Sequence, residues 1–85
     1  MNKHNCRVCG FFIDNLPWGE NGMCPTYEIC PCCGVEFGNE DYTLESIREY
    51  REKWLIKGAK WFDKAQKPED WSKEKQFENI PKDFR

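Results

Sequence analysis

Two short segments with the pattern C-x-x-C-G carry the most informative chemistry in the sequence. They span residues 6–10 and 30–34. Two cysteines three positions apart in a tight turn can direct both sulfurs at one ion. The glycine that follows can adopt a positive φ, which turns backbone N–H groups toward the thiolates. Two such turns supply four thiolates, a complete tetrahedral ligand set. The sequence therefore predicts one metal ion bound by Cys6, Cys9, Cys30 and Cys33.

Zinc is the metal expected at this site, with iron as the alternative, because both suit soft thiolate ligands. Four protein ligands leave no open position for a substrate, so the site is predicted to be structural. Redox catalysis by a Cys-x-x-Cys pair usually needs a low-pKa thiol at a helix N-terminus, and neither pair precedes a helical pattern. The only histidine is His4, and no phosphate-binding glycine loop is present. We therefore expect no enzymatic activity.

The remaining polar groups near the cysteines are given simpler interpretations. Cys24 and Cys32 are interpreted as free thiols, with a disulfide between them or a six-sulfur, two-metal cluster as alternatives. His4 could replace a ligand but is expected to belong to a mobile terminus. Three acids that follow the second segment are expected on a solvated face: Glu36, Glu40 and Asp41.

The two C-x-x-C-G turns resemble the metal knuckles of zinc-ribbon and rubredoxin-like proteins. Residues 26–34 read Thr-Tyr-Glu-Ile-Cys-Pro-Cys-Cys-Gly, which is similar to the Tyr-Glu-Ile-Cys-Pro-x-Cys stretch of the bacterial cysteine-rich CPCC family. The resemblance covers residues 6–42, although the first turn reads Cys-Arg-Val-Cys where that family usually has Cys-Pro-x-Cys. It implies metal binding by the same four cysteines without an established activity. For some relatives it also implies an immunity or partner-binding role in bacterial conflict systems.

Size and composition explain why a metal is expected. The chain has 85 residues, of which 6 are cysteine and 13 are aromatic. A chain of this length buries only about 60% of its unfolded surface, so a metal or disulfides commonly stabilise it. The start of the chain lacks an apolar signal-peptide core, and no stretch approaches the roughly 20 apolar residues of a membrane span. We therefore expect a cytoplasmic protein with no membrane partner, in which paired cysteines are metal ligands.

Charge is distributed unevenly along the chain. Residues 1–42 carry 2 basic and 6 acidic side chains, a net charge of −4, whereas residues 43–85 carry 11 basic and 9 acidic side chains, a net charge of +2. Nucleic-acid binding usually requires clustered lysine and arginine near the contacting element. The acidic metal-binding half therefore argues against a nucleic-acid partner.

The elements that position the cysteines are predicted to form one small α+β domain over residues 1–85. Residues 1–42 form a zinc-ribbon-like metal-binding part with two zinc knuckles, and residues 43–85 form a helical part. Three short segments of the first part are predicted to be strands of an antiparallel sheet: 11–13, 26–29 and 35–37.

One long and one short helix are predicted to follow. The first runs from Leu44 to Lys57, with Thr43 as its N-cap and Gly58 at its end. The second begins after Ser72 and ends before residue 81, and the last five residues are expected to be frayed. The long helix presents one apolar stripe: Leu44, Ile47, Tyr50, Trp54 and Leu55.

The leading functional prediction is a non-enzymatic zinc protein with a structural metal site that presents a surface to another protein, in an immunity or regulatory role. A rubredoxin-like iron protein that transfers electrons is one alternative, and a zinc-ribbon module that binds nucleic acid is another. The sequence decides neither the oligomeric state nor the exposure of Trp18 and Trp61. These tryptophans would either pack over the metal turns or form an exposed anchor for a partner.

Overall fold

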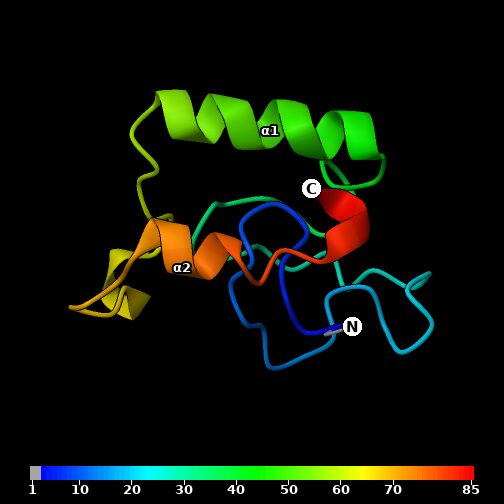
Figure 1. Cartoon of the computed structure of the whole chain (residues 1–85). Helices are drawn as coiled ribbons and strands as arrows, with labels where there is room; N and C mark the ends of the chain where they lie inside the picture. The colour runs from blue at the N-terminus through cyan, green and yellow to red at the C-terminus, as the bar shows by residue number, and fades with distance from the viewer. Residues whose placement is uncertain (1–2) are drawn as a thin grey trace.

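Two helices provide most of the regular structure in the computed structural model, which describes residues 3–85 (Figure 1). Helix α1 spans Leu44–Ile56 and helix α2 spans Lys73–Phe77. Two single 3-10 turns, η1 at Lys64–Gln66 and η2 at Lys82–Phe84, complete the helical elements of the described part. None of these helices is long and apolar enough to cross a membrane.

Helix α1 begins where the sequence predicts because of local capping. Thr43 Oγ1 accepts a hydrogen bond from the Ser46 backbone N–H at 3.1 Å, and Ser46 Oγ accepts one from the Thr43 N–H at 3.2 Å. This reciprocal capping box satisfies two N–H groups that the helix itself leaves without partners. The helix ends at Ile56, one residue before the predicted end, and Gly58 follows with a φ of 98°.

One face of α1 packs on the cysteine-rich loops. Ile47 and Trp54 are buried, and Tyr50 and Leu55 pack against the same core at its edge. Burying each large apolar side chain contributes about 1.5–3 kcal/mol. Four of the five residues of the predicted apolar stripe therefore hold the helix in place, whereas Leu44 is 38% exposed. Ile56, on the opposite face, is 77% exposed.

The predicted architecture of two zinc knuckles on a short antiparallel sheet is wrong. Within residues 3–85, extended pairing consists of two isolated antiparallel bridges: Asn5 with Phe12, and Ile29 with Glu36. Neither bridge grows into a ladder, and at the Ile29–Glu36 bridge the chain turns away on either side. Tyr27 has a φ of 62° and Gly38 a φ of 100°, values that a strand does not accommodate. The first half is therefore a set of turns, and the proposed division at residue 42 remains a prediction.

The core is built around the cysteines. Its members come from both C-x-x-C turns and from α1, and those with at most 1% exposure include Cys6, Val8, Cys9, Cys30, Cys32, Val35, Phe37 and Ile47. Helix α1 crosses one side of the loops, and the segment that contains α2 and η2 returns beneath it (Figure 1). The cysteine turns are thus enclosed by residues from the far end of the chain.

The end of the chain packs back on the core as the turn η2, where the sequence predicts frayed residues. Phe84 packs against the core cluster, and the carbonyl oxygens of Phe84 and Arg85 accept hydrogen bonds from Arg51 of α1 at 2.6 and 3.0 Å. A single arginine side chain therefore joins η2 to α1.

Candidate metal centre

The structure brings the four predicted ligand cysteines into one cluster. All four Sγ atoms lie within 4.8 Å of one another. The Sγ atoms of Cys6 and Cys33 are 3.7 Å apart, and so are those of Cys9 and Cys30. An ion with four metal–sulfur bonds of about 2.3 Å in a tetrahedron places its ligands about 3.8 Å apart. Each short pair joins one turn to the other, so the cluster could hold a metal ion between the two turns.

The two turns share one backbone geometry. In each, the N–H of the first cysteine donates to the carbonyl five residues later, and the glycine N–H donates to the carbonyl of the first cysteine, all at 2.9 Å. Gly10 and Gly34 have φ values of 84° and 82°, which a residue with a side chain rarely adopts. The glycine in each C-x-x-C-G segment therefore has the conformational role that the sequence predicts.

Burial gives the cluster its electrostatic character. The four cysteines are each at most 4% exposed. Burial raises the pKa of the Cys9 and Cys33 thiols, whereas hydrogen bonds from Cys33, Cys6 and Cys9 hold the pKa of Cys30 well below its usual range. Four buried thiolates at this spacing would repel one another strongly without a cation. The donor set is thus suited to a divalent ion that displaces the thiol protons.

Arg51 connects α1 to the first turn, a role that the sequence does not signal. Its Nε donates to the Val8 carbonyl at 2.7 Å and its Nη2 to the Arg7 carbonyl at 2.9 Å. The same guanidinium also donates to Phe84 and Arg85. Burial lowers the pKa of Arg51, and negative charge on the nearby Cys6 sulfur opposes that effect. The planar fork of five N–H donors explains why arginine is suited to this position.

Replacing Arg51 with methionine is expected to lower the free energy of unfolding of the metal-loaded protein by about 2–4 kcal/mol, because several charge-assisted hydrogen bonds are lost. Arg51→Lys should recover only part of the loss, since an ammonium group cannot reproduce the fork. Arg48→Met is the matched control, because Arg48 is exposed and donates once to the Arg85 carbonyl. Urea denaturation measures all three variants, and equal losses for Arg51→Met and Arg48→Met would contradict this assignment.

Gln76 of α2 contacts both turns. Its Nε2 donates to the Cys9 carbonyl at 3.1 Å and lies 3.3 Å from the Cys32 sulfur. Trp71 Nε1 donates to Gln76 Oε1 at 2.8 Å and fixes the amide orientation. The Gln76 carbonyl would lie 2.4 Å from a Cβ placed on Gly10, so glycine there also admits the backbone of α2.

The second turn is held from two other directions. Tyr50 Oη donates to the Cys33 carbonyl at 3.0 Å, and burial raises the pKa of Tyr50 to about 12. The N–H groups of Phe62 and Asp63 donate to the carbonyls of Cys32 and Pro31 at 3.0 and 2.8 Å. Both cysteine turns therefore depend on the helical half of the chain for their backbone partners.

Asp41 is fully buried, so the prediction that it lies on a solvated face is wrong. Its carboxylate accepts hydrogen bonds from Trp18 Nε1 at 2.8 Å and from the Gly38 N–H at 2.7 Å. The Arg7 guanidinium lies 4.0 Å from the centre of a Trp18 ring and 4.2 Å from that of Phe84. Burial raises the pKa of Asp41 and lowers that of Arg7. This cluster fixes the loop after the first turn.

The other candidate residues lie outside the four-sulfur cluster. Cys24 is exposed and Cys32 is buried, and both are unbridged thiols as predicted. His4 packs on the segment that follows the first turn: its Nδ1 lies 2.8 Å from the Ile13 carbonyl oxygen, and its ring stacks on Phe12 with centroids 4.8 Å apart. Trp18 and Trp61, whose exposure the sequence leaves open, are 8% and 5% exposed, so both belong to the interior.

The fold and the site together define a small protein of turns and two helices with a buried cluster of four cysteines. It is similar to "Uncharacterized protein YozI" of Bacillus subtilis (strain 168), with 28% identity over 83 residues that cover 79% of this chain and 69% of YozI. It is also similar to "Uncharacterized protein YoaQ" of the same strain, with 32% identity over 71 residues that cover 65% of this chain and 59% of YoaQ.

The chain therefore spans less than two thirds of the length of YoaQ. No family matches the chain, and no solved structure matches it significantly. Both relatives are bacterial proteins, and the placement of this chain in the CPCC family remains a prediction.

Proposed function

We propose that this chain is a non-enzymatic metal protein whose four cysteines bind one structural zinc ion and whose surface binds another protein. The observation that supports it is the enclosed four-sulfur cluster, in which Cys6, Cys9, Cys30 and Cys33 are each at most 4% exposed. A site with four protein ligands and no exposed face leaves no position for a substrate. The metal would then stabilise the fold, and reduced thiols of this kind suit the cytoplasm.

A protein partner, with an immunity or regulatory role, is the biological part of this proposal. Residues 1–42, which contain the cluster, carry a net charge of −4, which is unfavourable for contact with phosphates. Several large apolar side chains are exposed, among them Phe12 at 51% and Tyr27 at 62%. Exposed aromatic side chains of this size are common at protein-binding sites.

Native mass spectrometry of the full chain, purified without added metal, tests the metal assignment. We expect one zinc ion per chain, and mutation of any one of the four ligands should abolish stoichiometric binding. A folded chain that carries no metal would contradict the proposal. A red protein with one iron ion per chain would instead favour the electron-transfer alternative, because the same sulfur geometry accepts iron.

A further inference from the structure

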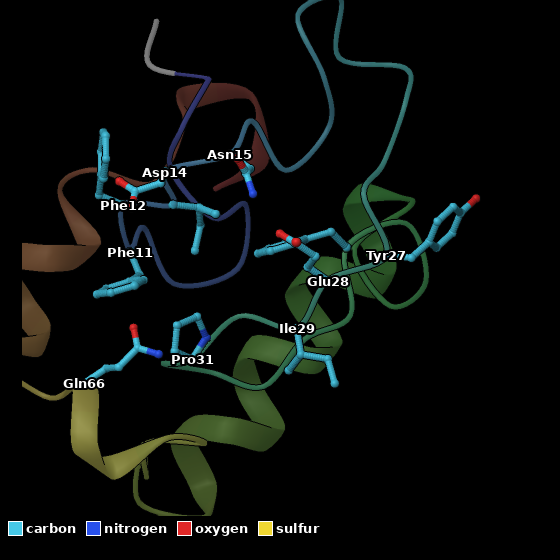
Figure 2. Close-up of a pocket in the computed structure, with 11 residues that line it drawn as sticks. Phe11, Phe12, Asp14, Asn15, Tyr27, Glu28, Ile29, Pro31 and Gln66 are labelled. Atoms are coloured by element: carbon cyan, nitrogen blue, oxygen red, sulfur yellow. The ribbon is translucent and has the colours of Figure 1, made fainter.

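An open groove lies beside the segments that flank the two cysteine turns (Figure 2). Its volume is about 790 Å³, and residues from the 11–15 and 27–31 segments line much of it. Phe12, Tyr27 and Ile29 contribute large apolar side chains that are 51%, 62% and 48% exposed. Groups of exposed apolar side chains in one hollow are characteristic of a binding site, and this volume is in the range of ligand-binding clefts.

Both segments offer free backbone groups beside this groove. Phe12 and Ile29 each take part in one of the two isolated bridges. In both bridges the hydrogen bonds are made by the neighbouring residues and not by the paired residues themselves. In such a non-hydrogen-bonded pair, the N–H and C=O of the central residue point away from the paired segment. Those groups of Phe12 and Ile29 have no hydrogen-bond partner within the part of the chain that the structure describes. Each segment is thus a short, open strand edge.

The charge around the groove has one sign. Asp14 and Glu28 line it, and the described lining residues include no lysine or arginine. Figure 2 shows their carboxylates on the two segments that border the groove. An occupant that carries lysine or arginine would therefore be favoured, and an acidic one would be repelled.

The backbone of Tyr27 is a second, independent feature. Its φ of 62° is rare for a residue with a large side chain. Its ring is packed over Gly38, where an added Cβ would lie 2.8 Å from Tyr27 Cε1. Backbone outliers that the surrounding structure holds in place cluster at binding sites. Here the conformation turns the chain at one end of the groove, and the Tyr27 ring points away from the other labelled residues that line it (Figure 2).

We propose that this groove binds an extended peptide segment of a partner protein, which pairs with the backbone of Phe12 or Ile29 and carries lysine or arginine beside its apolar side chains. Strand addition of this kind takes affinity from main-chain hydrogen bonds and specificity from pockets for alternate side chains. The inference rests on the proposed protein-binding function and specifies the chemistry of the partner.

A random decapeptide display library, panned against the metal-loaded full chain, tests the proposal. We expect the enriched peptides to alternate apolar residues with polar ones and to carry lysine or arginine. In a two-dimensional amide NMR spectrum, the best peptide should shift the signals of Phe12 and Ile29. Methylating every second backbone amide of the peptide should abolish binding for one of the two alternating sets and not for the other. The reason is that only every second amide faces the strand edge. Enrichment of acidic peptides, or no enrichment, would overturn the proposal.

Single variants separate the groove from the rest of the surface. Phe12→Ser should weaken binding of the best peptide about tenfold or more, because Phe12 is an exposed aromatic residue on the edge that the peptide would pair with. Glu28→Gln should weaken it roughly two- to five-fold and reduce its salt dependence. Ile56→Ser is the matched control, because Ile56 is 77% exposed on α1 and does not line the groove. Equal effects of Phe12→Ser and Ile56→Ser would count against the groove.

Two further measurements distinguish a failure of the metal site from a failure of the groove, and a peptide from a second copy of the chain. Metal content is measured on the same samples: a metal-free folded chain refutes the structural zinc site, whereas a zinc-loaded chain without peptide binding refutes only the groove. Analytical ultracentrifugation tests whether a second copy of the chain occupies the groove. If the chain forms a dimer and Phe12→Ser dissociates it, the occupant of the groove is a second copy of the chain and not a basic peptide.

Discussion

Removing the metal ion with a chelator is expected to unfold the zinc-loaded protein and to shift its tryptophan emission to longer wavelength. Structural zinc sites in small peptides contribute about 10–16 kcal/mol at neutral pH, which is as large as the whole stability of a typical domain. In this chain the four cysteines are themselves central members of the core. Once the ion leaves, mutual repulsion or protonation of the thiols would open that core.

Three tryptophans report on this unfolding from different positions. Trp18, Trp54 and Trp61 are 8%, 7% and 5% exposed, and they belong to the first loop, to α1 and to the segment after it. Helix α1 has 13 residues and would be marginal in isolation, so far-UV circular dichroism should also lose helical signal. Adding zinc back under reducing conditions should restore both signals. Removal of the ion with unchanged emission would mean that the metal does not support the core.

The residues of the candidate site were predictable from the sequence because their signals are local. The C-x-x-C-G pattern fixes both the ligand spacing and the glycine conformation within five residues. The cap at Thr43 is equally local, since its partner is three residues away. The start of α1 was therefore predicted correctly, and the structure groups the four predicted cysteines.

The sheet was predicted wrongly because a short apolar run does not indicate whether the residues on either side of it stay extended. The runs at 11–13 and 26–29 have strand-forming composition, yet each pairs at one residue only. Tyr27 leaves the extended region even though its residue type favours strands. Packing against Gly38 outweighs that intrinsic preference, and no pattern within the segment indicates it.

The partners that hold the site could not be inferred because they are distant in the chain. Arg51 donates to carbonyls 43 and 44 residues earlier, and Gln76 donates to one 67 residues earlier. Arg48 and Arg51 are both arginines of α1, so their residue type does not distinguish the half-buried Arg51 from the exposed Arg48. In the sequence Asp41 is one of several nearby acids, and only its contact with Trp18, 23 residues earlier, distinguishes it from them.

These distant contacts explain how a metal ion could stabilise helices that do not bind it. Arg51 of α1 and Gln76 of α2 both bind carbonyls of the first turn, and Tyr50 binds one of the second. If the ion fixes the turns relative to each other, it also fixes the acceptors that the helices use. Loss of one ligand should therefore affect the entire chain.

Substituting serine for Cys9 is expected to be far more damaging than the same change at Cys24 or Cys32. Serine offers a hard oxygen in place of a soft thiolate, so the tetrahedral set is broken and zinc affinity should fall at least about 100-fold. The free energy of unfolding in zinc should drop by roughly 4 kcal/mol or more, which is typical when a structural metal is lost. Zinc competition with a colorimetric chelator and thermal denaturation measure the two effects.

Two other cysteines provide controls that separate a ligand from a buried thiol. Cys24 is exposed, so Cys24→Ser should change stability by less than about 0.5 kcal/mol. Cys32 is fully buried between two ligand positions but lies outside the cluster, so Cys32→Ser should cost about 1–3 kcal/mol while one zinc ion per chain is retained. If Cys9→Ser also retained its ion and cost no more stability than Cys32→Ser, Cys9 would be a buried packing residue and not a metal ligand. Because Cys9 and Cys32 are equally buried, zinc stoichiometry is the measurement that tells a ligand from a packing residue.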